Sequence, residues 1–507
     1  MKSLVDFGKK LEHFCYNKTM KPLVFHVNSF WIQLVYFLFI SFVGYLGLKI
    51  SNPRTSSSSS SSSFILNDID IFFTSVSATT VSSMSTVEME VFSNTQLIII
   101  TILMLLGGEV FTSMLELQLK RSKFHTFSDS THKISVLEVS KEESDLESNN
   151  DNQISKSSLI KRLCYVILGY LVVVQVGGSS LVAIYLGLNP NSRNLLSKKG
   201  LHMQTFSTFL VVSTFTNCGF VPTNENMIVF KKNSVLLLIV MLLTLLGGTL
   251  YGPTLRFLIW GLGKITKRVE YSYMLRNPKE LGYNHLMPSL NSWFLVCTVF
   301  GFLIVQFLVF CCLEWHNSKI VDGMSWFEKL VAIIFQIVST RHSGETVFDL
   351  SVISPAILVV FIVMMYFPPC TSFWPMKQQE DDDPRSGKQS KIENKSVVEC
   401  VLFSQMSYLV IFIILICIVE REHLKGDPLN FSILNITLEV ISAYGNVGYS
   451  TGYSCARQLK QSNSCKDAMY GLVGRWSKFG KIILIIVMFF GRLKKFNING
   501  GQAWKIS

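Results

Sequence analysis

The chain has 507 residues, of which 49% are hydrophobic and 16% are charged, and its mean hydropathy is +0.38. Soluble domains average about 25% charged residues, so this composition, with several apolar runs of bilayer length, excludes an ordinary soluble protein and predicts a polytopic membrane protein. The formal charge of +12 is attributed to basic residues at the cytoplasmic ends of membrane helices, and the lack of a basic-aromatic module excludes nucleic-acid binding.

Four units, each built as apolar span, polar insert and apolar span, follow one another along the chain. In unit A, residues 29–118, the spans are expected near Phe30–Leu48 and Leu97–Leu117. The first span lacks the small-residue cleavage site of a signal peptide, so it is predicted to remain as a membrane helix. For unit B (161–263), unit C (290–376) and unit D (397–493), the expected spans are Leu163–Leu186, Val235–Leu262, Trp293–Leu313, Pro355–Phe373, Val398–Ile418 and Gly480–Phe490.

The segments outside the units are polar, and we predict that all of them are cytoplasmic. They are the N-terminus 1–28, the linkers 119–160, 264–289 and 377–396, and the C-terminus 494–507. Eight spans place both termini on one side of the membrane, and Lys and Arg are more frequent in these segments than in the units, which favours the cytoplasmic side.

Each unit carries one polar insert, and the four inserts share a pattern. They read SATTVSSM (Ser77–Met84), STFTNCGF (Ser213–Phe220), VSTRHSGE (Val338–Glu345) and SAYGNVGY (Ser442–Tyr449). The last small residue of each is Ser83, Gly219, Gly344 and Gly448. In three copies a Ser lies six positions before this residue, whereas the third copy has Val338 there.

The second spans repeat as well. Each contains a four-residue run that ends at Gly107, Gly247, Pro368 or Gly491 and reads MLLG, TLLG, MYFP or MFFG respectively. A repeat that includes both the insert and the following span indicates four copies of one structural unit.

The inserts are too short and too polar to cross a bilayer as helices. Non-helical backbone at membrane depth survives only inside protein or beside a water-filled cavity. We therefore predict four re-entrant loops, each a short pore helix followed by extended chain, that meet at one central pore. Helix C-terminal ends and backbone carbonyls at the meeting point favour a cation, and the lack of acidic residues at the four positions disfavours a hard divalent ion. Small residues that merely permit close helix packing would be the simpler interpretation of one copy alone.

The polar region after the fourth insert carries two kinds of candidate modification site. Cys455 and Cys465 lie in a polar loop and can pair if that loop is extracellular. Asn430 and Asn435 begin the sequons Asn-Phe-Ser and Asn-Ile-Thr, which are candidates for glycosylation on the same side. A sequon this close to the membrane can also go unused.

The chain resembles the plant high-affinity potassium transporters (HKT) of the Trk/Ktr/HKT superfamily over nearly its whole length. The resemblance rests on SVSATTVSSMSTVEMEVFSNTQ, TFTNCGFVPTNENM, ISAYGNVGYSTGYS and GRWSKFGKIILIIVMFFGR. It implies an all-α fold of four units, with eight transmembrane helices and four re-entrant pore helices around one pore. It also implies a filter for a monovalent cation made by Ser83, Gly219, Gly344 and Gly448.

The resemblance further implies a sodium preference, because members with Ser at the first filter position are typically sodium-selective and members with Gly also carry potassium. Asn224, just after the second filter residue, is a neutral flanking position where an acid is expected to change the preference. The third copy departs most from the pattern, with Arg341 and His342 beside Gly344.

Two basic residues of the last span are candidate pore charges. Lys481 and Arg492 lie eleven positions apart, which is three helical turns and therefore one face. The resemblance implies a positive charge near the pore that limits cation flow. The alternative for Arg492 is an ordinary cytoplasmic helix end, since Lys494 and Lys495 follow it.

The predicted function is passive, channel-like sodium transport across the plasma membrane, with no cofactor. The alternatives are a sodium–potassium cotransporter or a potassium-permeable transporter on the same scaffold, and a pore subunit without transport of its own. An enzyme is not expected, because the chain carries no HExxH, GxSxG or GxxxxGK[ST] motif. The expected partners are membrane lipid and monovalent cations, and the superfamily resemblance also implies a homodimer with a pore in each subunit.

Overall fold

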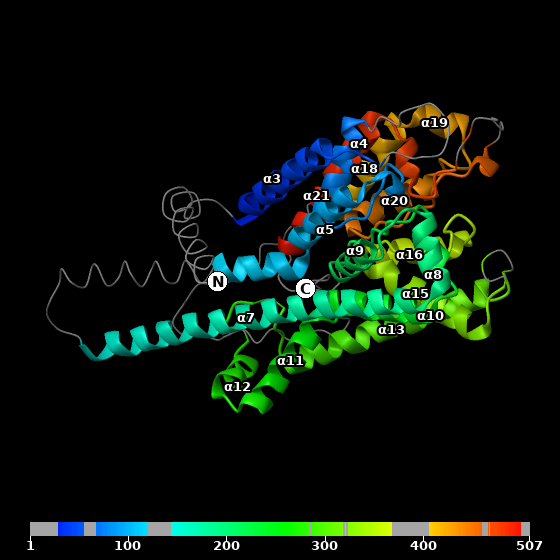
Figure 1. Cartoon of the computed structure of the whole chain (residues 1–507). Coiled ribbons are helices and arrows are strands. Elements are labelled where there is room, and N and C mark those ends of the chain that lie inside the picture. The colour runs from blue at the N-terminus through cyan, green and yellow to red at the C-terminus, as the bar shows by residue number, and fades with distance from the viewer. Residues whose placement is uncertain are drawn as a thin grey trace.

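The computed structural model of the chain, shown in Figure 1, describes most of the four units. The described residues are 29–54, 67–119, 143–278, 280–283, 285–317, 320, 323–367, 405–458, 465 and 467–497, with backbone alone for 143–157 and 494–497. The predicted N-terminus 1–28, the linker 377–396, Pro368 and residues 498–507 lie outside them, as does much of the linker 119–160.

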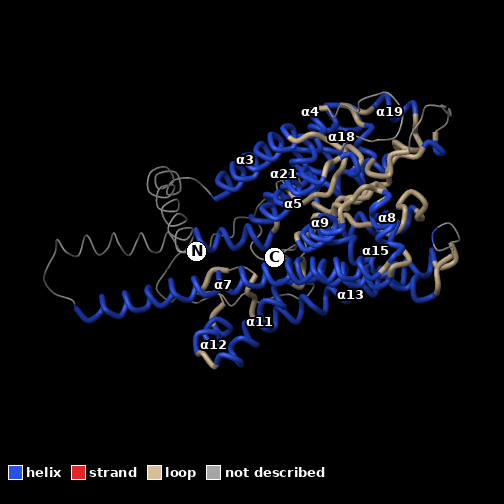
Figure 2. Tube along the Cα trace, viewed as in Figure 1, coloured by secondary structure: helices blue, strands red, loops and turns tan. Residues whose placement is uncertain are grey.

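The described chain is all-α, as Figure 2 shows, apart from one isolated bridge between Tyr453 and Ala468. The first helices of units A to D are α3 (Ser29–Ile50), α7 (Glu143–Leu188), α13 (Ser289–Glu314) and α18 (Gln405–Val419). The pore helices are α4 (Asp68–Thr79), α9 (Met203–Phe215), α15 (Trp326–His342) and α20 (Ile433–Gly445). The second helices are α5 (Asn94–Gly107), α10 (Ser234–Gly247), α16 (Pro355–Tyr366) and α21 (Lys478–Asn497). Between them lie α8 (Pro190–Lys198), α11 (Tyr251–Thr266), α12 (Val269–Arg276), α19 (Arg421–Gly426) and the 3-10 turns Met89–Val91, Asn226–Phe230, Cys455–Arg457 and Leu472–Arg475.

Within the described residues, three helices are long and apolar enough to cross a membrane alone, namely 30–50, 158–188 and 289–314. Two further segments pass the same test only as bent pairs, so five spans meet it at most. The helices α16 and α18 are apolar but have only 12 and 15 residues within the described chain. The described helices thus keep the predicted order of first, pore and second helix in each unit.

The bent pairs correct two predicted spans. The second span of unit A turns by 52° between Asn94–Gly107 and Glu109–Leu119, and that of unit B turns by 84° between α10 and α11. Both breaks follow a glycine that presses on a pore helix: a side chain at Gly107 or Gly247 would collide with the carbonyl oxygen of Thr79 or Phe215. The helix leaves its straight course directly after this contact.

The units are arranged in a ring. Each pore helix packs against the second helix of its own unit and against the second helix of the unit before it. The contacts between units run from α5 to α9, from α10 to α15, from α16 to α20 and from α21 back to α4. Because the last contact joins unit D to unit A, the ring is closed, and units A and C lie opposite each other.

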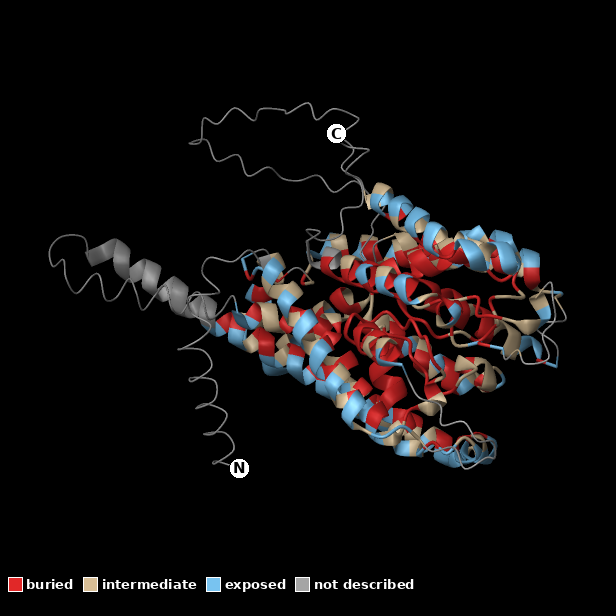
Figure 3. Cartoon of the chain, turned by 90° about the horizontal axis from the view of Figure 1, so that it is seen from above, coloured by how far each residue is buried: buried red, intermediate tan, exposed pale blue. Residues whose placement is uncertain are grey.

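Burial follows the same ring. The buried residues gather at the pore helices and the loops that follow them, and the exposed residues lie on the outer helices (Figure 3). Large apolar side chains such as Phe39, Val173 and Ile304 are more than half exposed on the outer faces of the first helices. Lipid does not penalise such faces, so an apolar exterior around a polar, buried centre is the pattern of a membrane pore protein.

Candidate functional site

Three of the four pore helices end in the same turn. The helices α4, α9 and α20 are each followed by a residue in the left-handed region, namely Val81 (φ 57°), Asn217 (φ 58°) and Asn446 (φ 51°). Two positions later the backbone enters positive φ again, at Ser83 (53°), Gly219 (90°) and Gly448 (98°). Glycine and asparagine tolerate these angles, whereas Val81 and Ser83 carry a steric cost there. Unit A therefore adopts the same turn although Val81 and Ser83 disfavour its backbone angles.

The repeated Ser at the start of each motif accepts the hydrogen bond that closes this turn. The carbonyl of Ser77 accepts from the amide of Ser82 at 2.8 Å, and that of Ser213 accepts from Cys218 at 2.8 Å. The carbonyl of Ser442 likewise accepts from Val447 at 3.0 Å. The six-residue spacing in the sequence is thus the spacing that this turn requires.

The third copy departs from the others because it lacks the left-handed residue. The helix α15 continues to His342, and the amide of Ser343 donates to the carbonyl of Ser339 at 2.9 Å, as within a regular helix. Gly344 therefore follows Ser339 by five positions, and Ser339, not Val338, is the structural counterpart of the opening Ser. A helix without the extra residue explains why this copy matched the pattern least.

The four predicted filter residues meet at one point. A methyl group placed on Gly344 would lie 2.5 Å from the hydroxyl oxygen of Ser83 and 2.8 Å from the carbonyl oxygen of Val447. One placed on Gly219 would collide with the backbone nitrogen of Gly344, and one placed on Gly448 would collide with the Ser83 side chain. Since units A and C are opposite, the Ser83 hydroxyl reaches across the ring axis.

Side chains from neighbouring units hold the loops at this meeting point. Between units B and C, the Asn226 amide donates to the carbonyl of Gly344 at 3.0 Å, and its oxygen accepts from the amide of Thr346 at 3.2 Å. The buried Glu345 carboxylate also accepts from the hydroxyl of Thr214 at 2.8 Å. The carbonyl of Gly344 therefore already has a protein donor.

The remaining junctions are tied in the same manner. Between units C and D, the side chain of Gln336 donates to the Tyr449 hydroxyl at 2.8 Å, and this hydroxyl donates to the Gln336 carbonyl at 2.8 Å. Between units D and A, the Asn446 amide donates to the Ser82 hydroxyl at 2.8 Å. These buried bonds fix the loops relative to one another, because losing one partner would leave the other unsatisfied.

The repeated run of the second helices has a steric explanation. A side chain at Gly107, Gly247 or Gly491 would collide with the carbonyl oxygen of Thr79, Phe215 or Tyr444 respectively. Each of these carbonyls lies four positions before the filter residue of its unit. The glycines therefore let each second helix touch the end of its pore helix. The fourth counterpart, Pro368, is outside the described residues.

Asn224 lies at the junction of units A and B. Its amide donates to the Glu88 carboxylate at 3.1 Å and its backbone donates to Glu90 at 3.0 Å. The Lys199 ammonium bonds the carboxylates of Glu90 and Glu225, each at 2.6 Å. Burial lowers the pKa of Lys199, but these two hydrogen bonds outweigh it and place the pKa above its ordinary value.

The two candidate pore charges occupy different surroundings. Lys481 is 7% exposed and its ammonium lies 2.7 Å from the carboxylate of Asp70 at the start of α4. Arg492 is 2% exposed and donates to the carbonyl of Gly107. Lys481 therefore pairs two helices, whereas Arg492 is the charge near the pore loops.

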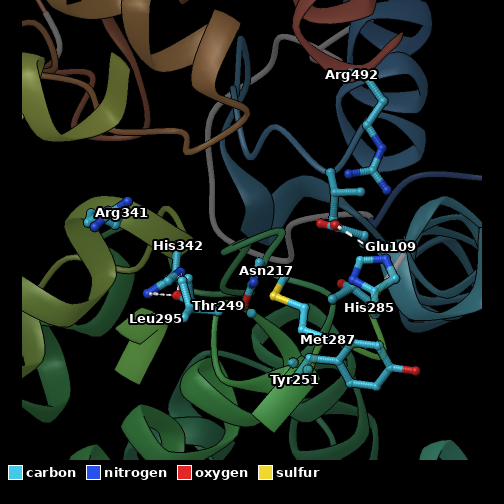
Figure 4. A pocket seen from close by; sticks show the side chains of 15 residues that line it. Glu109, Asn217, Thr249, Tyr251, His285, Met287, Leu295, Arg341, His342 and Arg492 are labelled. Atoms are coloured by element: carbon cyan, nitrogen blue, oxygen red, sulfur yellow. Dashed lines mark hydrogen bonds and ion pairs between the residues drawn. The ribbon is translucent and has the colours of Figure 1, made fainter. Parts of the chain in front are cut away.

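Arg492, near the C-terminal end of α21, lines a cavity beside the loops (Figure 4). Glu109 points toward the cavity beneath Arg492, and its carboxylate lies 3.8 Å from the His285 ring. Pore-helix ends also contribute, through Val81, Thr216, Asn217, Arg341 and His342. The cavity thus brings a cationic side chain next to three of the four loops.

The modification candidates differ in outcome. Cys455 and Cys465 form a disulfide in the structure, ten positions apart. Asn430 is fully buried, and its amide nitrogen donates to Asp427 at 2.8 Å and to the carbonyl of Ser454 at 3.0 Å. The Asn435 amide is 6% exposed and donates to the Asn430 carbonyl at 2.8 Å. Both side-chain nitrogens are buried and hydrogen-bonded in this fold, and glycosylation at either sequon stays a prediction.

Comparison with known proteins places this geometry in a family. The family model for TrkH, described as a cation transport protein, matches residues 130–498. The chain belongs to the TrkH family. The sodium transporter HKT1 of Arabidopsis thaliana is 50% identical over 476 residues, covering 90% of this chain and 91% of the relative. The cation transporter HKT1;3 of Oryza sativa subsp. japonica is 46% identical over 503 residues, covering 95% and 92%.

Two more distant matches are a sequence relative and a solved structure. The potassium transporter TRK1 of Candida albicans is 27% identical over 354 residues, which is 66% of this chain and 32% of the relative. The crystal structure of the potassium transporter TrkH from Vibrio parahaemolyticus superposes with a TM-score of 0.51 at 14% identity, covering 93% of this chain and 84% of that one. As a TrkH family member, the chain is an ion transporter for monovalent cations and not an enzyme, and it needs no cofactor.

Sequence reasoning missed the buried polar residues behind the loops. These are Asp70, Gln336, Glu345 and Glu439, together with the half-buried Asn226. A signal for two of them was present: Gln336 and Glu439 interrupt apolar stretches of their pore helices, each three positions before the Ser whose carbonyl lies at the helix end. Residues that contact another unit, such as Asn226, do not follow the periodicity of a helix, so a single sequence does not identify them.

Proposed function

We propose that the chain conducts sodium passively through the ring of Ser83, Gly219, Gly344 and Gly448. The convergence of these four residues, with the Ser83 hydroxyl reaching toward Gly344 on the opposite side, carries the proposal. An ion that passes this point exchanges hydration water for loop oxygens. No energy source enters the scheme, so the ion moves down its electrochemical gradient.

Ser83 supports a sodium preference in two ways. Its side chain occupies space that a glycine would leave open, and the narrower ring suits the smaller ion. Its hydroxyl also adds one oxygen to a ring in which the Gly344 carbonyl is already engaged by Asn226. Larger potassium needs a wider ring of free carbonyls, so it fits this arrangement less well.

Arg492 is proposed to limit the flow of cations. Its guanidinium faces a cavity shared with three pore loops, where a positive charge repels a passing cation. Cytoplasmic termini are proposed from the distribution of basic residues, and a location in the plasma membrane is proposed from the resemblance to the HKT transporters. The homodimer stays a prediction.

The test is Ser83→Gly in a cell that carries little background alkali-metal current. Wild-type protein should show a reversal potential that follows the sodium gradient and shifts strongly when sodium is replaced by potassium. Ser83→Gly should raise the permeability to potassium relative to sodium by at least about threefold, since it removes the side chain and the strain at φ 53°. Ser85→Gly, a buried serine two positions further, serves as the matched control.

The competing candidate is a sodium–potassium cotransporter on the same scaffold. One relative of the chain is named a potassium transporter, and this favours considering a cotransporter. It predicts that external potassium alters sodium current in wild-type protein at a fixed voltage, whereas passive sodium conduction predicts no coupling between the two ions.

A further inference from the structure

One position on the pore helices carries a long polar side chain in only two units. It lies three residues before the Ser whose carbonyl accepts at the helix end. The four occupants are Thr74, Leu210, Gln336 and Glu439. Thr74 donates to the carbonyl of Asp70 in its own helix, and Leu210 is apolar. Gln336 and Glu439 instead reach the extended chain that leaves the filter.

Gln336 forms hydrogen bonds with two filter strands, the extended segments that follow Gly344 and Gly448. Its side-chain oxygen Oε1 accepts from the backbone amides of Val347 at 3.0 Å and Phe348 at 3.3 Å, which lie three and four positions after Gly344. Its amide nitrogen donates to the hydroxyl of Tyr449, which directly follows Gly448. Every polar group of this fully buried side chain thus acts on the chain next to a filter residue.

Glu439 acts on the fourth strand through Ser450. The Ser450 hydroxyl oxygen accepts from the amides of Gly452 and Leu472, each at 3.0 Å. Its single proton is donated to one carboxyl oxygen of Glu439. Ser450 lies two positions after Gly448, so the carboxyl group fixes the strand that carries this filter residue.

The second carboxyl oxygen of Glu439 makes no hydrogen bond, and Glu439 forms no ion pair, within the part of the chain that is described. The side chain is fully buried. A buried acid with an unsatisfied carboxyl oxygen is costly compared with an apolar side chain of similar size. A role in stability alone would therefore be better served by leucine, as in unit B, than by glutamate.

We propose that Glu439 is a positioning residue for ion selectivity, with Gln336 as its counterpart in unit C. Through Ser450 and Tyr449, the two side chains set how far the strands after Gly344 and Gly448 stand from the ring axis. The proposal rests on the proposed function, because it takes the four residues to be the filter. It assigns the selectivity of the ring partly to residues that never touch the ion.

The experiment compares Glu439→Leu, Glu439→Gln, Ser450→Ala and Tyr449→Phe in the full chain. Each variant is measured for surface expression and for the sodium-to-potassium permeability ratio from reversal potentials. Glu439→Leu, Ser450→Ala and Tyr449→Phe should lower this ratio at least threefold. Glu439→Gln keeps an oxygen for the Ser450 hydroxyl, as Gln336 does for its own strand, and should stay within twofold of wild type.

Glu420→Gln is the control for loss of a buried acid. Glu420 is fully buried and accepts from Ser477 and His423, away from the filter, so its ratio should equal that of wild type. The proposal is overturned if the variants that remove the bonds conduct with the wild-type ratio. It is overturned equally if Ser450→Ala and Tyr449→Phe, which each delete one oxygen, fail to reach the surface, since their role would then be folding alone.

Parallel measurement of Ser83→Gly separates this proposal from the proposed function. If Ser83→Gly changes the ratio and the Glu439 and Ser450 variants do not, the assignment of the filter is supported and the positioning role of Glu439 is rejected. If Ser83→Gly leaves the ratio unchanged as well, the assignment of the filter itself is wrong.

Discussion

Lys481 and Asp70 provide the sharpest test of how the ring is closed. The pair joins α21 of unit D to the start of α4 of unit A, its side chains are 9% and 6% exposed, and the charged atoms lie 2.7 Å apart. Lys481→Met removes one charge and leaves a buried carboxylate without its partner. Breaking a buried ion pair in this way costs about 3–5 kcal/mol.

Two double variants test whether the lost stability comes from the ion pair. Lys481→Met combined with Asp70→Leu removes both charges and should recover most of the loss, because an apolar pair of similar volume replaces a buried ion pair at little or no cost. Exchanging the residues, Lys481→Asp with Asp70→Lys, should recover less, since a lysine in the first turn of α4 opposes the helix dipole by about 0.3–1 kcal/mol.

The assay is the thermal stability of the protein in detergent, together with sodium current from cells. Lys49 and Asp68 are a matched control, because they are 2.8 Å apart but 48% and 66% exposed, and Lys49→Met should leave stability close to that of wild type. If Lys481→Met instead leaves stability intact and raises the current, Lys481 is a pore charge and the pairing account is refuted.

Three further outcomes follow from the geometry. Gly247→Ala should sharply lower the folded yield because its methyl group meets the Phe215 carbonyl, whereas Gly301→Ala, with open space around it, should not; equal yields would contradict the packing account. Cys455→Ser with Cys465→Ser should lower stability by about 2.5–3 kcal/mol on the chain-entropy model, and wild-type protein treated with reductant should match it. Lys199→Met should lower thermal stability at neutral pH. Because the folded pKa of Lys199 is raised, its contribution is complete below about pH 10.4, the unfolded value, and is lost above the folded pKa, so the difference from wild type should shrink at more alkaline pH; a constant difference would remove the ion pairs from the explanation.

The repeat was the feature that the sequence conveyed best. Apolar runs and four similar inserts predicted an all-α membrane fold, and the closing hydrogen bond of Ser77, Ser213 and Ser442 shows why the six-residue spacing recurs. The third copy escaped the pattern because α15 lacks the left-handed residue, so one position is missing and the alignment shifts to Ser339.

Features that depend on contacts between residues far apart in the sequence could not be predicted. The bends follow Gly107 and Gly247, which contact carbonyls of the pore helices more than twenty positions earlier in the sequence. Pairing of Lys481 with Asp70 joins residues at opposite ends of the chain. The sequon at Asn430 reads as a surface site in the sequence, but the fold buries its amide between Asp427 and Ser454.

The reversal potential of the wild-type chain, expressed alone and measured while external sodium is replaced by potassium, tests the central claim most directly. Passive sodium conduction through the Ser83 ring predicts a large negative shift in potassium and a potential that follows the sodium gradient. A reversal potential that does not change when the two ions are exchanged would contradict it.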